Sequence, residues 1–229
     1  MQSMVRKKAT KLYLAITDPS LASLSSQRYV VGTNRPGNES TAAFISTSDP
    51  QKRIYLTELF FEVPEFTLNR NALYSGFNVA AHYRAGTLIH ELAHQTGNTH
   101  DIADLDSSAP FADFLDDSRA ETEVIRDQLR SLRATALSHN TPADRLFRID
   151  DGEGWRDIVE RDGAMKEVIL RITGTTNLAD ARHVFLNDEQ KRAEVILSNA
   201  DSVAALLMDL GRSQVLPEPG DDETITSSR

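Results

Sequence analysis

Residues 85–101 read AGTLIHELAHQTGNTHD, and this stretch carries the clearest structural pattern in the chain. Apolar side chains recur through it at helical spacing, as Leu88 and Leu92 illustrate, so we expect a helix over about residues 81–97. Gly97 is expected to end that helix, because glycine adopts positive φ without strain. The chain would then turn back and bring the following residues near the last turn of the helix.

The same stretch contains the pattern His-Glu-x-x-His. His90 and His94 are four residues apart, so on a helix both imidazoles lie on one face and can converge on one metal ion. A catalytic zinc ion needs a third protein ligand and one position open to water. Both His100 and Asp101 follow the turn and are chemically able to be that ligand. Glu91 would project beside the ion without binding it, which suits a general base.

A solvated helix with two surface histidines is the plain alternative to a metal site. The five residues before the motif, AGTLI over residues 85–89, are apolar enough to anchor the helix in a hydrophobic core. A surface helix would have no reason to bury its histidine-bearing face beside them. The pattern therefore favours a metal site.

The composition limits the kinds of partner and site. The chain has 229 residues, with 25 Lys and Arg against 34 Asp and Glu and a net charge of −9. Phosphates would be repelled by this charge, so we expect neither nucleic acid nor a membrane as a partner. The chain contains no Cys, which excludes disulfides and cysteine nucleophiles and means that any metal must be held by His, Asp and Glu.

No apolar run approaches the ~20 residues that span a bilayer. The apolar stretch at residues 12–16 is broken early by Thr17-Asp18-Pro19, which makes it a poor signal peptide. We therefore expect a protein of the bacterial cytoplasm, or one that is secreted or delivered as an effector by a leaderless route.

The sequence predicts an α+β fold with one domain over residues 1–215. A small N-terminal sheet is expected within about residues 25–80. The strand candidates are short runs rich in β-branched and aromatic residues, at residues 27–31, 41–46 and 53–61. The last is the strongest, and we expect it to pair with a hairpin partner upstream.

The C-terminal half, about residues 110–211, is expected to be mostly helical. The spacing of apolar side chains predicts helices over residues 118–137, 155–172 and 187–210. Gly211 is the expected C-cap of the last one. Residues 216–229 are rich in Pro, acidic residues and Ser/Thr, and are expected to be disordered.

Two families of zinc peptidases contain similar patterns. The spacing His-Glu-x-x-His-x-x-Gly-x-x-His-Asp resembles the metzincin motif, which implies His100 as the third zinc ligand. Residues 85–94 resemble the active-site helix of the aspzincins, the family of deuterolysin and peptidyl-Lys metalloendopeptidase, and residues 52–61 are similar to the strand before that helix. Residues 97–104 resemble that family's Gly-Thr-x-Asp-x-x-Tyr motif, which implies Asp101 as the ligand. We favour Asp101 over His100, and expect the other residue to orient a ligand.

The chain departs from the aspzincin motif in two places. One residue is inserted after Gly97, and Asp104 stands where the family has a Tyr that stabilises the transition-state oxyanion. A carboxylate cannot donate that hydrogen bond unless it is protonated. Tyr74 and Tyr83 are nearby tyrosines that could take the role.

Several other residues have plainer interpretations. Glu121 and Glu123 could imitate the downstream ligand of a gluzincin, but acidic residues at a helix start are favoured by the helix dipole. Met165 is expected in the core rather than in a metzincin-like turn. The remaining histidines are expected to be structural or surface residues: His82, His139 and His183. More loosely, residues 181–185 and 199–203 resemble metallopeptidase-like modules of bacterial toxins and effectors.

Together these patterns predict a zinc-dependent endopeptidase. His90, His94 and Asp101 (or His100) would hold Zn²⁺, and Glu91 would take a proton from the zinc-activated water that attacks the peptide bond. The substrate would be a protein or peptide, paired by strand addition beside the upstream strand. The zinc would lie between the sheet and the helices of a zincin-like fold. The alternative is a non-catalytic metal-binding or scaffold domain, and its motivation is the missing Tyr.

Overall fold

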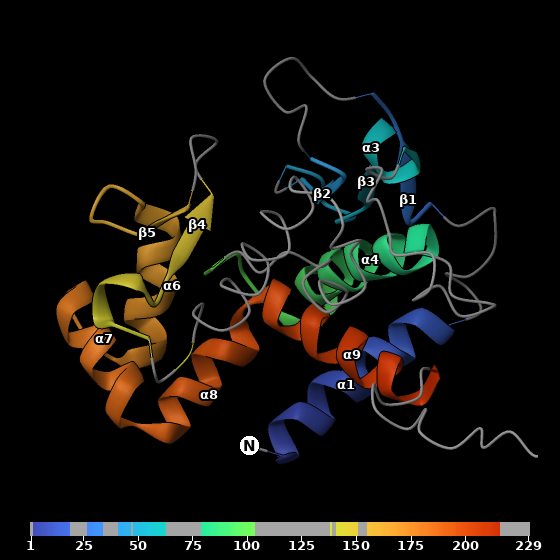
Figure 1. Ribbon diagram of the computed structural model, residues 1–229. Coiled ribbons are helices and arrows are strands. Elements are labelled where there is room, and N and C mark those ends of the chain that lie inside the picture. The colour runs from blue at the N-terminus through green and yellow to red at the C-terminus, as the bar shows by residue number, and fades with distance from the viewer. Residues whose placement is uncertain are drawn as a thin grey trace, which may run out of the picture.

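Seven α-helices and five short strands make up the part of the chain that the computed structural model describes, namely residues 2–18, 27–33, 41–46, 48–62, 79–103, 138, 141–150 and 155–215. The strands form two small sheets, and helices hold most of the described residues (Figure 1). The expected mixture of helices and small sheets is therefore confirmed. None of the described helices is both long and apolar enough to cross a lipid bilayer. The helix predicted over residues 118–137 and the tail over residues 216–229 lie outside the described residues.

The N-terminal sheet contains three strands in the order β1-β3-β2, which are β1 (Tyr29–Val31), β2 (Ala43–Ile45) and β3 (Ile54–Leu56). β1 is parallel and β2 antiparallel to β3, so the expected upstream hairpin partner of β3 is confirmed. Because side chains alternate along a strand, Ile54 and Leu56 are buried while Tyr55 lies on the opposite face. There it stacks on Phe44, with ring centroids 5.1 Å apart.

The strand predicted over residues 53–61 is shorter than expected, because Thr57 ends it. This threonine is buried, and its hydroxyl lies 2.6 Å from the carbonyl oxygen of Thr41 and 2.9 Å from that of Ala42. The chain then turns into the short helix α3 (Glu58–Phe61). The apolar residues at the end of the predicted strand are therefore helical.

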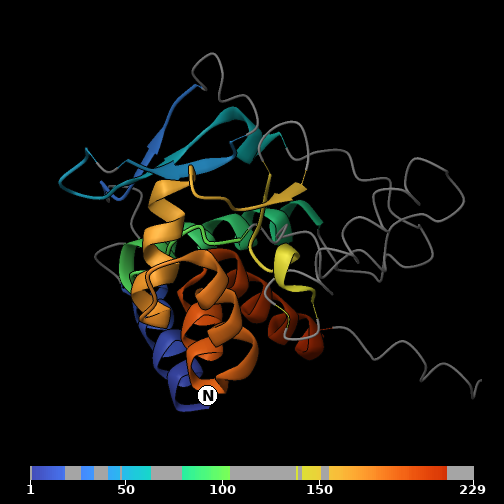
Figure 2. The ribbon, with the colours of Figure 1, turned by 90° about the vertical axis from the view of Figure 1, so that its left-hand side faces the viewer.

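Helix α4 (Val79–Gly97) lies between this sheet and two other helices, α1 (Gln2–Thr17) and α9 (Ala200–Val215), as Figures 1 and 2 show. It packs against β2 on one side and against α1 and α9 on the other. Buried apolar residues of these elements form a first hydrophobic cluster: Leu12, Ala43, Ile54, Leu56, Phe60, Leu92, Ala93, Ala200 and Val203. The helix predicted over about residues 81–97 is confirmed, although it begins two residues earlier, at Val79, and α1 was not predicted.

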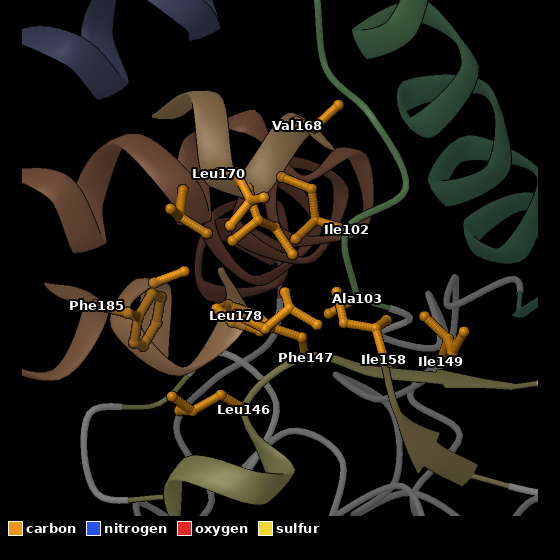
Figure 3. Close-up of a cluster of buried hydrophobic side chains, with 13 residues drawn as sticks. Ile102, Ala103, Leu146, Phe147, Ile149, Ile158, Val168, Leu170, Leu178 and Phe185 are labelled. Carbon is orange, nitrogen blue, oxygen red and sulfur yellow. The ribbon is translucent and has the colours of Figure 1, made fainter. Parts of the chain in front are cut away.

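The rest of the described chain begins with a one-turn 3₁₀ helix (Ala143–Arg145) and a hairpin of β4 (Arg148–Asp150) and β5 (Trp155–Asp157). Three helices follow: α6 (Gly163–Thr173), α7 (Leu178–Asn187) and α8 (Glu189–Ser198). Buried side chains of these helices, of the hairpin region and of the loop after α4 form a second hydrophobic cluster, which Figure 3 shows: Ile102, Ala103, Leu146, Phe147, Ile149, Ile158, Val168, Ile169, Leu170, Leu178, Ala181, Phe185 and Val195. Ile102 and Ala103, from the loop after α4, are part of it, so this loop connects the two clusters.

Two helices are wrong in the prediction. The helix predicted over residues 155–172 begins only at Gly163, because residues 155–157 form β5. The helix predicted over residues 187–210 is interrupted twice. The side chain of Asp188 caps α8 by accepting a hydrogen bond from the backbone N–H of Lys191, and Asn199 separates α8 from α9. Gly211 lies inside α9 and is not a C-cap.

Candidate metal centre

Helix α4 presents His90 and His94 side by side. Their Nε2 atoms are 3.0 Å apart, and the two rings meet edge to face. Leu92, on the opposite side of the helix, and Ala93, on its flank, are almost fully buried in the first hydrophobic cluster. The packing of these two residues therefore fixes the direction in which the histidines point.

The turn after α4 brings Asp101 to the two histidines. Its Oδ1 lies 3.3 Å from Nε2 of His90 and 3.1 Å from Nε2 of His94. The left-handed conformation that this turn needs is adopted by Asn98, at φ 50°, so the expectation that Gly97 supplies it is wrong. Asparagine tolerates this conformation better than most residues. It is also the residue inserted relative to the aspzincin motif.

The outer nitrogens of both rings are already engaged. Nδ1 of His90 lies 2.5 Å from Oδ1 of Asp201, at the start of α9, and Nδ1 of His94 lies 3.0 Å from the backbone oxygen of Thr99. A carbonyl oxygen can only accept, and so can an ionised carboxylate, which assigns the proton of each neutral ring to Nδ1. Both Nε2 atoms then present lone pairs to each other and to the Asp101 carboxylate. Three acceptors that face one another need a positive charge between them.

The pKa values of the two histidines and of Asp101 also favour a positive charge between them. Burial alone would lower the pKa of His90, but hydrogen bonds to Asp101 and Asp201 outweigh it and hold the pKa well above its usual value. The pKa of His94 is also raised, because the effect of Asp101 exceeds that of burial. In return, the two histidines hold the pKa of Asp101 far below its usual value, against the effect of partial burial. These three side chains together therefore favour a cation between them, whether a proton or a metal ion.

His90, His94 and Asp101 form a group that could hold a metal ion. Tetrahedral bonds of about 2.0–2.1 Å separate two ligand atoms by roughly 3.3 Å. The three ligand atoms are separated by 3.0, 3.1 and 3.3 Å, close to that spacing. The Asp101 side chain is 51% exposed, so the group is open to solvent on the Asp101 side.

Glu91 lies beside this group rather than in it. Its Oε1 is 3.9 Å from Nε2 of His90, and its side chain is only 6% exposed. Burial raises the pKa of Glu91, although the neighbouring histidines oppose the effect. A buried carboxyl with a raised pKa is suited to accept a proton from one reacting group and return it to another.

His100 points away from the cluster, toward α6. Its Nε2 lies 3.4 Å from Nη2 of Arg171, and burial together with this guanidinium lowers its pKa. Its backbone joins the start of α9: its N–H donates to the oxygen of Ser198, and its own oxygen accepts from the N–H of Ala200. The sequence predicts that whichever of His100 and Asp101 is not a ligand orients one. In the structure, Asp201 makes such a contact with His90, and no sequence pattern marks Asp201 for this role.

The remaining candidates are distributed as follows. Met165 packs against the second hydrophobic cluster, as expected, and His183 is exposed on α7 beside Asn187. Tyr83 lies seven residues before His90 on α4, about 10 Å along the helix axis. The residues that lie outside the described part of the chain are Tyr74, Asp104, Glu121, Glu123 and His139, together with the side chain of His82.

No protein-family model, curated protein or solved structure matches this chain. A functional assignment therefore rests on the chemistry of its own residues. The relevant chemistry is the convergence of two imidazole nitrogens and one carboxylate oxygen next to a buried glutamate.

Proposed function

We propose that the chain is a zinc-dependent endopeptidase of the zincin type, most similar to the aspzincins. His90, His94 and Asp101 would hold the ion, and Glu91 would be the general base. The observation that carries this proposal is the meeting of two imidazole nitrogens and one carboxylate oxygen at 3.0–3.3 Å, with the Glu91 carboxyl directly beside them. Two imidazoles and one carboxylate suit zinc, which accepts nitrogen and oxygen ligands in a tetrahedral site.

Zinc in such a site acts as a Lewis acid, which polarises a carbonyl group and makes water more acidic. Glu91 would take one proton from the attacking water at a carboxylate oxygen. The water oxygen forms a bond to the carbonyl carbon of the peptide, and the C–N bond then breaks. Glu91 would return its proton to the departing nitrogen. Its low exposure keeps bulk water from competing for that proton.

The substrate would be an extended peptide that pairs with an edge of the N-terminal sheet. The upstream strand itself, β3, has β1 on one side and β2 on the other, so it cannot accept another strand. β2 is an edge strand among the described strands, and it packs against α4. Pairing with β2 would therefore bring the substrate alongside the helix that carries His90 and His94.

The alternative is a domain that binds the metal without turnover, and it is favoured by Asp104 at the position of the aspzincin Tyr. Two measurements on the purified chain separate these functions. Near-stoichiometric zinc after gentle purification is expected for both, and its absence would contradict both.

The second measurement compares proteolysis of a complex protein mixture by wild type, Glu91→Gln and Glu189→Gln. Glu189 is an exposed acid in the first turn of α8 and serves as the matched control. We expect Glu91→Gln to retain zinc and lose at least about 100-fold in rate, the usual contribution of a general base, while the control cleaves like wild type. Equal cleavage by all three proteins would refute Glu91 as the base. Zinc binding without cleavage by wild type would favour the non-catalytic alternative.

A further inference from the structure

We propose that the junction of α8 and α9, formed by Asn199 and the first two residues of α9 (residues 199–201), is the positioning element of the metal centre. In it, Asp201 orients the ligand His90, and Asn199 fixes the loop that carries the ligand Asp101. The inference rests on the proposed metal centre, but it does not require that the centre be catalytic. It concerns residues that are about 100 positions away from the histidine motif in the sequence.

Asp201 acts on His90 through the ring nitrogen that faces away from the cluster. Its side chain is 17% exposed and comes from the first turn of α9. Ala200 and Val203, on the same turn, are buried against α4, so packing fixes the carboxylate relative to the His90 ring. The charged hydrogen bond to Nδ1 opposes flipping of the ring, places the proton of the neutral ring on Nδ1, and makes Nε2 a stronger electron donor.

Asn199 acts on the loop after Asp101. It is fully buried, and its Oδ1 accepts hydrogen bonds from the backbone N–H groups of Ile102 and Ala103 at 3.0 and 3.2 Å. Its Nδ2 donates to the oxygen of Ala103 at 2.7 Å and to the hydroxyl of Ser202 at 2.9 Å. The amide thus uses both of its donors and accepts twice, a set that neither Asp nor Leu could reproduce.

Asp101 depends on this element for its position. The backbone of His100, just before it, is hydrogen bonded on both sides to Ser198 and Ala200, and the two residues after it are bound by Asn199. Asp101 itself is half exposed, so its own packing does little to hold it. One short segment therefore sets the distance between the ligands on α4 and the ligand on the loop.

The role of Asp201 is tested by competition of the full-length protein with a chelating dye for zinc. We expect Asp201→Ala to weaken zinc binding about 10- to 100-fold, as is usual for residues that hold a ligand, and Asp201→Asn to weaken it less because an amide oxygen still accepts. Asp180→Asn is the matched control, since Asp180 is also an acid in the first turn of a helix, α7. It should bind zinc like wild type.

A spectroscopic measurement separates orientation from a general loss of structure. In the zinc-loaded wild type, NMR of ¹⁵N-labelled histidine should show His90 protonated at Nδ1 and that proton protected from exchange with water. The signal should persist in Asp180→Asn and disappear in Asp201→Ala. Unchanged affinity and an unchanged ring signal in Asp201→Ala would overturn the inference and leave the zinc site standing. Failure of wild type to bind zinc would overturn the proposed centre itself.

The role of Asn199 is tested against a second asparagine. Asn177 caps α7, where its Oδ1 accepts from the N–H of Asp180 at 2.9 Å, so its removal also destabilises a helix junction. We expect Asn199→Ala to lose about 10-fold or more in zinc affinity and Asn177→Ala to lose none, even where both lower the unfolding temperature. Equal zinc affinities in the two variants would contradict a positioning role for Asn199.

Discussion

Replacing Asp101 by Asn should remove most of the zinc affinity of the chain, whereas replacing His100 by Gln should leave it unchanged. Asp101 Oδ1 lies 3.1 and 3.3 Å from the two Nε2 atoms, while Nε2 of His100 lies beside Arg171. The two residues are adjacent, so each variant is a control for the other.

The expected loss of zinc affinity in Asp101→Asn can be worked out from the number of ligands. Structural zinc sites bind with about 10–16 kcal/mol over four ligands, or roughly 3 kcal/mol for each one. A loss of ~3 kcal/mol of binding free energy raises the zinc dissociation constant about 150-fold. Asn keeps an oxygen near the position of Oδ1 but removes its charge. We therefore expect a loss of about 100-fold for Asp101→Asn, in the absence of other changes.

A thermal unfolding assay converts this difference into a temperature. At a free zinc concentration 100 times the wild-type dissociation constant, binding stabilises the folded protein by about 2.7 kcal/mol. In a chain of this size that raises the unfolding temperature by roughly 5–10 °C. At the same concentration Asp101→Asn would be about half occupied and gain only ~0.4 kcal/mol, or roughly 1 °C. His100→Gln should show the full wild-type rise.

The same thermal unfolding assay can also show that the assignment of Asp101 is wrong. If His100→Gln loses the zinc-dependent rise and Asp101→Asn keeps it, the third ligand is His100 and the metzincin spacing describes the site. If both variants keep the full rise, neither residue is a ligand, and the reasoning from interatomic distances is refuted.

Two further predictions concern ion pairs of the C-terminal part. Arg182→Met should destabilise the protein by about 3 kcal/mol in urea unfolding, because it leaves the largely buried Asp157 carboxylate without its partner. The less buried pair of Lys191 and Glu194, three residues apart on α8, serves as control, and Lys191→Met should cost less than about 0.5 kcal/mol. The Arg156 guanidinium lowers the pKa of Asp162 from 3.8 to about 2, so this pair stabilises the fold above pH 4 and loses its effect as the pH falls toward 2. Asp162→Asn should remove that part of the acid sensitivity, about 1 kcal/mol after allowance for solvent screening, and an unchanged acid-unfolding profile would contradict the assignment.

The parts of the site that could be predicted from the sequence are those set by local spacing. His90 and His94 lie on one face because a helix repeats every 3.6 residues, and the apolar residues Leu92 and Ala93 indicate which side faces the core. Asp101 follows because a turn must come after the helix. The three strands of the first sheet were likewise visible as short β-branched and aromatic runs.

Long-range contacts could not be predicted in this way. Asp201 reaches His90 across 111 positions in the sequence, and no local pattern marks a carboxylate that will meet an imidazole. The interruptions of the predicted helix before Asp201 are only weakly indicated by the sequence. Asn199 and Asp188 are residue types that favour helix starts, yet apolar spacing continues across both of them and favours one long helix. One long helix does not form in the structure, because the side chain of Asp188 caps α8 and the side chain of Asn199 binds the loop after Asp101.

The position of the centre between two hydrophobic clusters has a consequence for its stability. His90 and His94 lie on α4, which packs in the first cluster through Leu92 and Ala93, whereas the loop of Asp101 continues into Ile102 and Ala103, which pack in the second cluster. The three ligand atoms can meet only while the two clusters stay docked, and Asn199 lies at their junction. A bound cation would therefore join two separately packed parts of the chain, so metal affinity and the docking of the clusters are linked in free energy. A metal centre built on one helix alone would have no such coupling.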